Sequence, residues 1–241
     1  TNFTKAFEFV KRPILNSLYI CALSLLGILI NATLSGYAFA RLRFRGKKAM
    51  YSILVAVLMV PATITIVPQF LIVSKLGIIN TYWALILPYI GSQQVLGVIL
   101  CRTAFEQMPQ ELFDAAKIDG ASEFRIYGQI ILPISKPALA TIGLFTAIAY
   151  FSKWFEVLMY IDDRELWTIQ YMLQRVMKDI QYLRDNPDIA MSEEGIAMLA
   201  NLPNESAKMA LTVITMTPVL AFYPFFQKYF VKGLTLGAIK G

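Results

Sequence analysis

Five long apolar stretches recur along this chain of 241 residues. A helix needs about 20 residues to cross the hydrocarbon core of a bilayer, where the backbone must satisfy its own hydrogen bonds. Only 16% of the residues are charged and 57% are hydrophobic, whereas a soluble domain carries about 25% charged residues. The chain is therefore predicted to be an all-α integral membrane protein. The predicted spans cover residues 14–40, 49–73, 82–101, 138–161 and 207–230.

Prolines interrupt two of these spans, with Pro61 and Pro68 in the second and Pro88 in the third. Proline removes a backbone donor, so kinks or local unwinding are expected at these positions. Such breaks are tolerated in a membrane where neighbouring helices or a water-lined cavity satisfy the freed carbonyls. They are interpreted first as structural bends.

The basic residues predict the orientation of the spans. The connection 41–48 holds five basic residues and no acid, and cytoplasmic connections carry an excess of Lys and Arg. Alternation of the spans then places residues 102–137 inside and residues 162–206 outside. Lys232 and Lys240 in the tail agree with an inner carboxyl end. The net charge of +6 is thereby explained by orientation, and no nucleic-acid partner is expected.

Several functional classes are disfavoured. The chain has no histidine, which excludes the commonest zinc sites and Ser-His catalysis. Cys21 and Cys101 lie in or beside apolar runs and are interpreted as small buried hydrophobic residues. The glycine-rich tail lacks the Gly-Lys-Ser/Thr ending of a phosphate loop, so the chain is not expected to bind ATP. A membrane-embedded enzyme remains an alternative, but Lys153 and Glu156 are the only ionisable pair within a span and no nucleophile with a base is apparent.

A polar segment, residues 114–133 with the sequence DAAKIDGASEFRIYGQIILP, lies between two long apolar segments. One short helical pattern ends near Ile118 and a second runs over residues 122–131. Gly120 between them can take a positive φ at no steric cost. Two short helices joined there make a compact projection suited to a groove on another protein. The alternative is a helical hairpin that merely connects two spans.

The segment resembles the cytoplasmic loop of permease subunits of ATP-binding-cassette importers. The pattern of that loop is Glu-Ala-Ala, three residues, Gly, nine residues, Ile, one residue and Leu-Pro; only Asp114 in place of Glu departs from it. The resemblance implies that residues 102–137 form a cytoplasmic coupling loop that docks on a separate ATPase subunit. The residues expected to couple to the ATPase are Asp114, Ala115, Ala116, Asp119, Gly120, Ala121 and Pro133.

The rest of the chain is similar to the carbohydrate branch of these importers, in the partner subunit of maltose-type systems. The extended connection 162–206 and residues 223–228 resemble a sub-branch that handles larger oligosaccharides. Residues 151–154 depart from the branch, because relatives often show Trp-Asn there, and this leaves the substrate open. An importer of amino acids or another small solute is the alternative. The matching segments are 16–17, 36–46, 60–61, 67–68, 76–81 and 230–241.

The resemblance also implies an architecture and a set of partners. The fold would be that of a type I importer permease, a single transmembrane domain over residues 1–241, with one further span ahead of residue 1. The partners would be the lipid bilayer, a second homologous permease subunit, two ATPase subunits and an extracytoplasmic solute-binding protein. The chain would bind no cofactor, and ATP and Mg would belong to the ATPase subunits. The location would be a bacterial cytoplasmic membrane, crossed several times.

Polar residues inside the spans are costly in lipid and mark candidate positions on a substrate path. Lys153 and Glu156 are three residues apart, so on a helix they would share a face and neutralise each other. Nearby aromatic rings offer stacking surfaces for sugars. Anchoring at the membrane interface is the alternative for Lys153 and Trp154, and bonding between helices is the alternative for Gln93 and Gln94. The candidates are Asn31, Gln69, Gln93, Gln94, Tyr150, Lys153, Trp154 and Glu156.

The outer connection, 162–206, contains one helical stripe of apolar residues. A helix that packs on its own subunit or lies on the membrane surface is one explanation; a contact surface for the solute-binding protein is the other. We expect a mixture, in which the helix packs and the loop 186–204 touches the binding protein. The stripe consists of Ile169, Met172, Leu173, Val176, Ile180 and Leu183.

Overall fold

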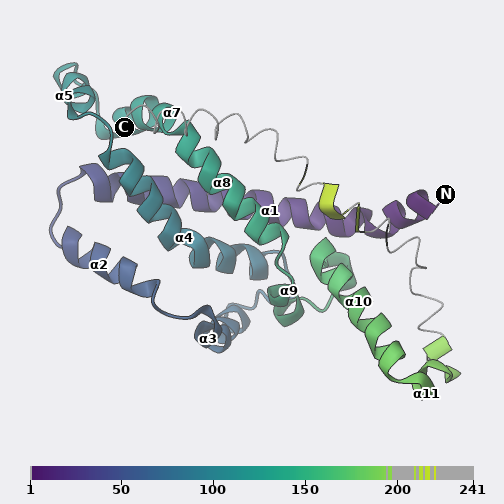
Figure 1. Ribbon diagram of the computed structural model, residues 1–241. Coiled ribbons are helices and arrows are strands. Elements are labelled where there is room, and N and C mark those ends of the chain that lie inside the picture. Colours follow the sequence, from purple (N-terminus) through teal and green to yellow (C-terminus); the bar gives the residue numbers. More distant parts are fainter. Residues whose placement is uncertain are drawn as a thin grey trace, which may run out of the picture.

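The structure, a computed structural model, describes residues 2–193, 195, 196, 209, 212, 213, 215–217 and 220, with side chains from Val10 onward except that of Gln93. All regular structure in this described part is helical (Figure 1). The helices are α1 (Asn2–Arg41), α2 (Lys47–Val57), α3 (Ala62–Lys75), α4 (Trp83–Glu106), α5 (Gln110–Ile118), α6 (Glu123–Ile126), η1 (Tyr127–Ile131), α7 (Leu132–Ile134), α8 (Lys136–Phe151), α9 (Phe155–Tyr160), η2 (Arg164–Leu166), α10 (Ile169–Asp185) and α11 (Pro187–Ala190).

The long helix α1 is the element on which the others assemble. Its 40 residues correspond to about 60 Å at a rise of 1.5 Å per residue. It packs along α4 through small residues, which let helix backbones approach closely. A Cβ added at Gly36 would lie 2.6 Å from Cβ of Cys101, and one at Gly97 would lie 3.0 Å from Cβ of Ala32. These two glycines therefore set the spacing between α1 and α4.

Length and composition allow one straight membrane span and up to three bent ones in the described part of the chain. The straight span is Val10–Arg41. The bent pairs are α2 with α3 at 102°, the two arms of α4 at 44°, and residues 123–134 with α8 at 73°. The predicted fifth span, 207–230, lies largely outside the described residues.

The second predicted span is not a single helix, which corrects the sequence expectation. The helix α2 ends at Val57, and α3 begins at Ala62 after Pro61, whose extended backbone has φ −61° and ψ 133°. A break at Pro61 was expected from its missing donor, but a bend of 102° turns the two halves into separate arms. Pro68 and Pro88 lie inside α3 and α4 without ending either helix.

The fourth predicted span also departs from a continuous helix. The helix α8 ends at Phe151, and a short irregular segment precedes α9, which ends before the extended residue Ile161. Lys153 and Trp154 consequently lie on irregular backbone rather than on a helix face. Helical periodicity therefore does not determine the directions in which their side chains point.

The buried core forms separate clusters along α1. Cys21 belongs to a cluster with residues of α4 and α9, and Cys101 belongs to a second cluster near the carboxyl end of α1. Both thiols are free and buried, as their apolar surroundings predicted. By contrast, α2 has no buried residue, and together with α3 it forms an exposed apolar arm that includes Met59, 83% exposed.

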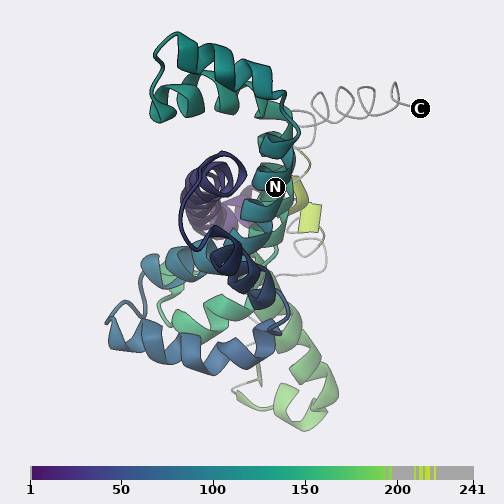
Figure 2. The ribbon, with the colours of Figure 1, turned by 90° about the vertical axis from the view of Figure 1, so that its left-hand side faces the viewer.

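The amino-terminal part of α1 is bonded to the segment that leads into α10. The Asn16 side-chain amide donates to the carbonyls of Glu165 and Trp167 at 2.8 and 3.0 Å. The Ser17 hydroxyl accepts from the Ile169 amide at 2.9 Å. In Figure 1, α10 lies towards this end of α1, whereas α5 and α7 lie at the opposite end. Figure 2, which views α1 almost end-on, separates the same two groups.

The predicted apolar stripe of the connection 162–206 is found on α10. Ile169, Met172, Val176 and Leu183 are buried, and the first two pack in one cluster with Val10 of α1. The expectation that this helix packs on its own subunit is confirmed. Most of the loop 186–204 beyond α11 lies outside the described residues, so its contact with a binding protein stays a prediction.

Candidate functional site: a docking loop and two cavities

The predicted loop consists of two short helical segments joined by a tight turn. The first, α5, ends at Ile118, and Gly120 has a φ of +73°, the left-handed conformation that glycine adopts without strain. Ser122 caps the second segment, because its hydroxyl accepts from the Arg125 amide. The turn at Gly120 and both predicted helices are therefore confirmed.

Large apolar side chains are exposed on both sides of this turn. Ile118 is 85% exposed and Phe124 is 81% exposed, whereas Phe113 and Ile126 anchor the loop in the core. Among the predicted coupling residues, Ala116 is buried and Ala121 is half-buried; the exposed ones are Asp114, Ala115, Asp119, Gly120 and Pro133. An exposed apolar tip with small residues beside it is typical of a protein contact surface.

Three side chains on one face of α1 hold the loop. They are spaced by four residues, which places them one above another on a helix. Thr33 shares a hydrogen bond of 2.7 Å with the hydroxyl of Tyr127, and the Tyr37 hydroxyl donates to the Glu123 carboxylate. That hydrogen bond is the main reason why the pKa of Glu123 is lowered. Arg41 completes the row, and we call these three residues the α1 clamp.

Arg41 binds the corner between α4 and the loop. Its guanidinium donates to the Phe105 carbonyl (2.6 and 3.2 Å) and to the Met108 carbonyl (2.6 Å). It also donates to the Gln110 side chain at 2.8 Å and lies 4.0 Å from the centre of the Phe113 ring. The Phe105 carbonyl also accepts from the Met108 amide at 3.3 Å, and Arg41 on a neighbouring helix adds a charged donor to this carbonyl and to that of Met108.

Two cavities lie away from the docking loop. The first, the α3–α9 cavity, has a volume of about 220 Å³ and contains three of the predicted path residues, Gln69, Lys153 and Glu156. Hydroxyl groups and aromatic rings surround them. The lining residues are Ala62, Thr63, Thr65, Ile66, Gln69, Pro88, Tyr89, Ser92, Lys153, Phe155, Glu156, Met159 and Tyr160.

Lys153 and Glu156 form an ion pair in this cavity. The expectation that they share a helix face is wrong, since Lys153 precedes α9 and only Glu156 belongs to its first turn. The irregular backbone nevertheless brings the two charges together. The Lys153 ammonium also lies 4.8 Å from the centre of the Tyr89 ring, a geometry that favours a cation over an aromatic face.

Other predicted path residues make contacts elsewhere. The Gln94 side chain donates to Asn31 at 2.9 Å and so joins α4 to α1. Tyr150 is buried, and its ring stacks on Tyr89 with ring centres 4.6 Å apart; neither cavity is lined by it. The side chain of Gln93 lies outside the described part.

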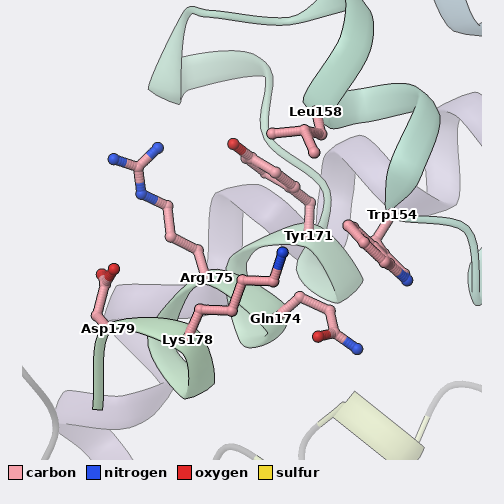
Figure 3. A pocket seen from close by; sticks show the side chains of 7 residues that line it. All are labelled: Trp154, Leu158, Tyr171, Gln174, Arg175, Lys178 and Asp179. Atoms are coloured by element: carbon pink, nitrogen blue, oxygen red, sulfur yellow. The ribbon is translucent and has the colours of Figure 1, made fainter. Parts of the chain in front are cut away.

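Trp154 lines the second cavity, the α9–α10 cavity, which also measures about 220 Å³. In Figure 3 its indole faces side chains that rise from α10. Trp154 therefore does not share a cavity with Lys153, although the two residues are adjacent in the chain. The lining residues are Trp154, Leu158, Tyr171, Gln174, Arg175, Lys178 and Asp179.

Sequence reasoning missed the α1 clamp and did not assign a site to the polar face of α10. The clamp had a signal, because Thr33, Tyr37 and Arg41 recur every four residues over the last turns of the first predicted span. The α10 residues also had one: Tyr171, Arg175 and Lys178 fall at helical spacing opposite the apolar stripe. Charged residues on such a face are ordinarily solvated, so the sequence alone does not mark these residues as a site, and only the cavity in the structure does.

Comparison with known proteins identifies the family. Residues 24–236 match the model of the binding-protein-dependent transport system inner membrane component. The chain belongs to this family.

Two curated relatives come from Bacillus subtilis (strain 168). Protein LplC is 35% identical over 205 residues, which cover 85% of this chain and 66% of LplC. The polygalacturonan/rhamnogalacturonan transport system permease protein YtcP is 31% identical over 234 residues, which cover 97% of this chain and 78% of YtcP. A solved bacterial ABC transporter involved in the import of the acidic polysaccharide alginate has a chain with a TM-score of 0.78 and 24% identity, covering 95% of this chain and 79% of that chain.

Membership of the family confirms the main sequence expectations. The chain is a membrane protein with the fold of an ABC importer permease, as the structural likeness shows. It is a permease subunit rather than an enzyme. A permease of this family works with an ATPase and a binding protein.

Proposed function

We propose that this chain is the permease subunit of an ATP-driven importer that moves sugars, oligosaccharides in particular, into a bacterial cell. The family match over residues 24–236 carries the proposal, and the named substrates of YtcP and of the alginate importer are both polysaccharides. An importer of amino acids has no comparable support among these relatives.

The proposed assembly contains a second, homologous permease, two ATPase subunits and an extracytoplasmic binding protein, in the bacterial cytoplasmic membrane. ATP and Mg belong to the ATPase subunits. The exposed apolar arm of α2 and α3 supports contact with lipid or with the second permease, because such a surface is unfavourable in water. The chain crosses the membrane several times in this assembly.

In the proposed mechanism, ATP binding draws the two ATPase subunits together and displaces the docked loop. Ile118 and Phe124 at the exposed tip enter the ATPase, while the α1 clamp passes the displacement to the spans. The α3–α9 cavity lies on the sugar path. Gln69 and the Lys153–Glu156 pair there provide hydrogen bonds to hydroxyl groups, and Tyr89 and Tyr160 provide rings for apolar sugar faces.

Replacing Gly120 by leucine tests the coupling role. A non-glycine residue in the left-handed conformation costs about 1–2 kcal/mol, and a Cβ at Gly120 meets no atom within 4 Å. The change therefore distorts the turn without a clash. Gly77 is a matched control, because its φ of +67° and its open surroundings are similar, but it follows α3 away from the loop.

The assay is sugar-stimulated ATP hydrolysis by the co-purified complex with its binding protein and a panel of oligosaccharides. We expect one or more sugars to stimulate the wild type, Gly77→Leu to retain stimulation, and Gly120→Leu to lose most of it while part of the complex still assembles. Equal stimulation in both variants would contradict the coupling role. If no sugar stimulates the wild type and no ATPase subunit co-purifies, the proposed function is wrong.

A further inference from the structure

The α9–α10 cavity has the chemistry of a binding site for a negatively charged sugar. We propose that it binds one acidic sugar unit, a hexuronate, of the transported oligosaccharide; this inference rests on the proposed function and names the substrate class. Its volume of about 220 Å³ equals that of about seven water molecules in the liquid. That space suits a single ring with its carboxylate rather than a chain.

Aromatic surface is the first element of the site. Trp154, which immediately precedes α9, and Tyr171 of α10 both line the cavity (Figure 3). Tyr171 is held edge-on against Trp167, with ring centres 5.1 Å apart, and is buried. A fixed ring with one accessible part can pack against the C–H face of a sugar, as aromatic groups do in binding sites with a few placed polar groups.

Two cations from α10 are the second element. The Lys178 ammonium lies 5.0 Å from the centre of the Trp154 ring, and Figure 3 shows it pointing between Trp154 and Tyr171. Arg175 lies over the ring of Trp167 at 4.9 Å. Within the described part of the chain, neither cation has a carboxylate within ion-pair distance. An anion entering the cavity therefore meets two positive groups and the single carboxylate of Asp179, which forms an ion pair with neither of them.

The remaining polar groups favour a sugar over a simple anion or a lipid phosphate. Gln174 supplies an amide that both donates and accepts, and Asp179 supplies an acceptor, which are the partners that hydroxyl groups need. A fully ionised phosphate has no hydroxyl group to donate to the Asp179 carboxylate, whereas a sugar ring carries several. The α3–α9 cavity differs, because Lys153 is paired with Glu156 there and offers no such excess of positive charge.

The direct test uses the permease complex with its partner subunits in nanodiscs of phosphatidylcholine, without the binding protein. The probe is digalacturonate, and its dimethyl ester is the uncharged control of nearly the same shape. Binding is measured by calorimetry for wild type, Lys178→Met, Arg175→Met and the matched control Lys75→Met. Lys75 is exposed at the end of α3 and does not line the cavity.

We expect Lys178→Met and Arg175→Met each to weaken digalacturonate binding by at least about tenfold, since a hydrogen bond to a charged group contributes roughly 1.5–3 kcal/mol and tenfold corresponds to about 1.4 kcal/mol. Lys75→Met should bind like the wild type. The ester should bind at least about tenfold more weakly than the acid and should not respond to Lys178→Met.

Equal binding of the acid by wild type and by both cavity variants would overturn the inference, as would equal binding of acid and ester. If digalacturonate does not bind but phosphatidylglycerol raises the melting temperature in a Lys178-dependent manner, the cavity is a lipid site and the inference is wrong. Neutral oligosaccharides separate the two proposals. If only neutral sugars stimulate ATP hydrolysis, the acidic-sugar site is contradicted but the proposed function stands. If no sugar stimulates ATP hydrolysis, the proposed function itself is contradicted.

Discussion

The α1 clamp can be tested at its strongest member by replacing Arg41 with methionine. Methionine keeps an unbranched chain that can still cover the Phe113 ring, but it removes every donor. The carbonyls of Phe105 and Met108 and the side-chain oxygen of Gln110 then lose the Arg41 donor, although the Phe105 carbonyl keeps the Met108 amide. The corner between α4 and the loop should consequently open more often.

The size of the effect follows from the contacts. A hydrogen bond to a charged group contributes roughly 1.5–3 kcal/mol, and a cation over an aromatic ring adds about 0.5–1 kcal/mol at an exposed site. Arg41 is only half-buried, so water replaces part of what is lost. We estimate a net cost of about 2–4 kcal/mol, or roughly 30- to 700-fold in the opening equilibrium.

Amide hydrogen exchange over residues 105–113 of the assembled complex measures this opening, and sugar uptake measures its consequence. Arg41→Lys should fall between wild type and Arg41→Met, because an ammonium lacks the planar fork of donors. Arg12→Met is the matched control: Arg12 pairs with Glu165 on the surface, with both side chains more than half exposed, and such pairs contribute about 1 kcal/mol or less. If exchange in Arg41→Met rises no more than in Arg12→Met, the clamp does not hold the loop.

Three further changes probe other parts of the molecule. Gly36→Leu should lower the melting temperature of the complex and Gly91→Leu should not, because a Cβ at Gly36 would lie 2.6 Å from a side-chain carbon of α4 whereas one at Gly91 meets nothing within 4 Å; equal melting would contradict the close approach. Phe124→Asp should abolish co-purification of the ATPase subunit, because a carboxylate replaces the exposed aromatic ring. Retained co-purification would show that Phe124 does not take part in docking. Glu156→Leu should cost about 1–3 kcal/mol in thermal unfolding by leaving a charged donor without its partner. Adding Lys153→Met should restore stability but not uptake, and recovery of both would make the pair purely structural.

The loop was predictable because its determinants are local. Gly120 with polar neighbours specifies a turn, and the helical pattern that begins at Ser122 specifies the second helix, so a few adjacent residues decide the structure. The α1 clamp was not predicted, because Tyr37 and Glu123 are 86 residues apart. Their contact depends on how α1, α4 and the loop pack together, and no local sequence pattern predicts this packing.

The spans and the candidate path were predicted less completely for a related reason. Pro61 predicted a break in the second span, but the size of the bend depends on the neighbours of the freed carbonyls. Lys153 and Trp154 are adjacent, and helical spacing placed them together with Glu156 in one site. Because α8 ends at Phe151, the irregular segment points Lys153 and Trp154 into different cavities.

The helix α1 makes hydrogen bonds to other segments at two distant positions. Asn16 holds the segment before α10, and Arg41 holds the docking loop; the 25 residues between them correspond to about 38 Å of helix. If this segment moves as a rigid body, a tilt of about 10° around its midpoint moves each end by roughly 3 Å, and the two ends move in opposite directions. A displacement of the docking loop would thus be accompanied by an opposite displacement of the segment before α10.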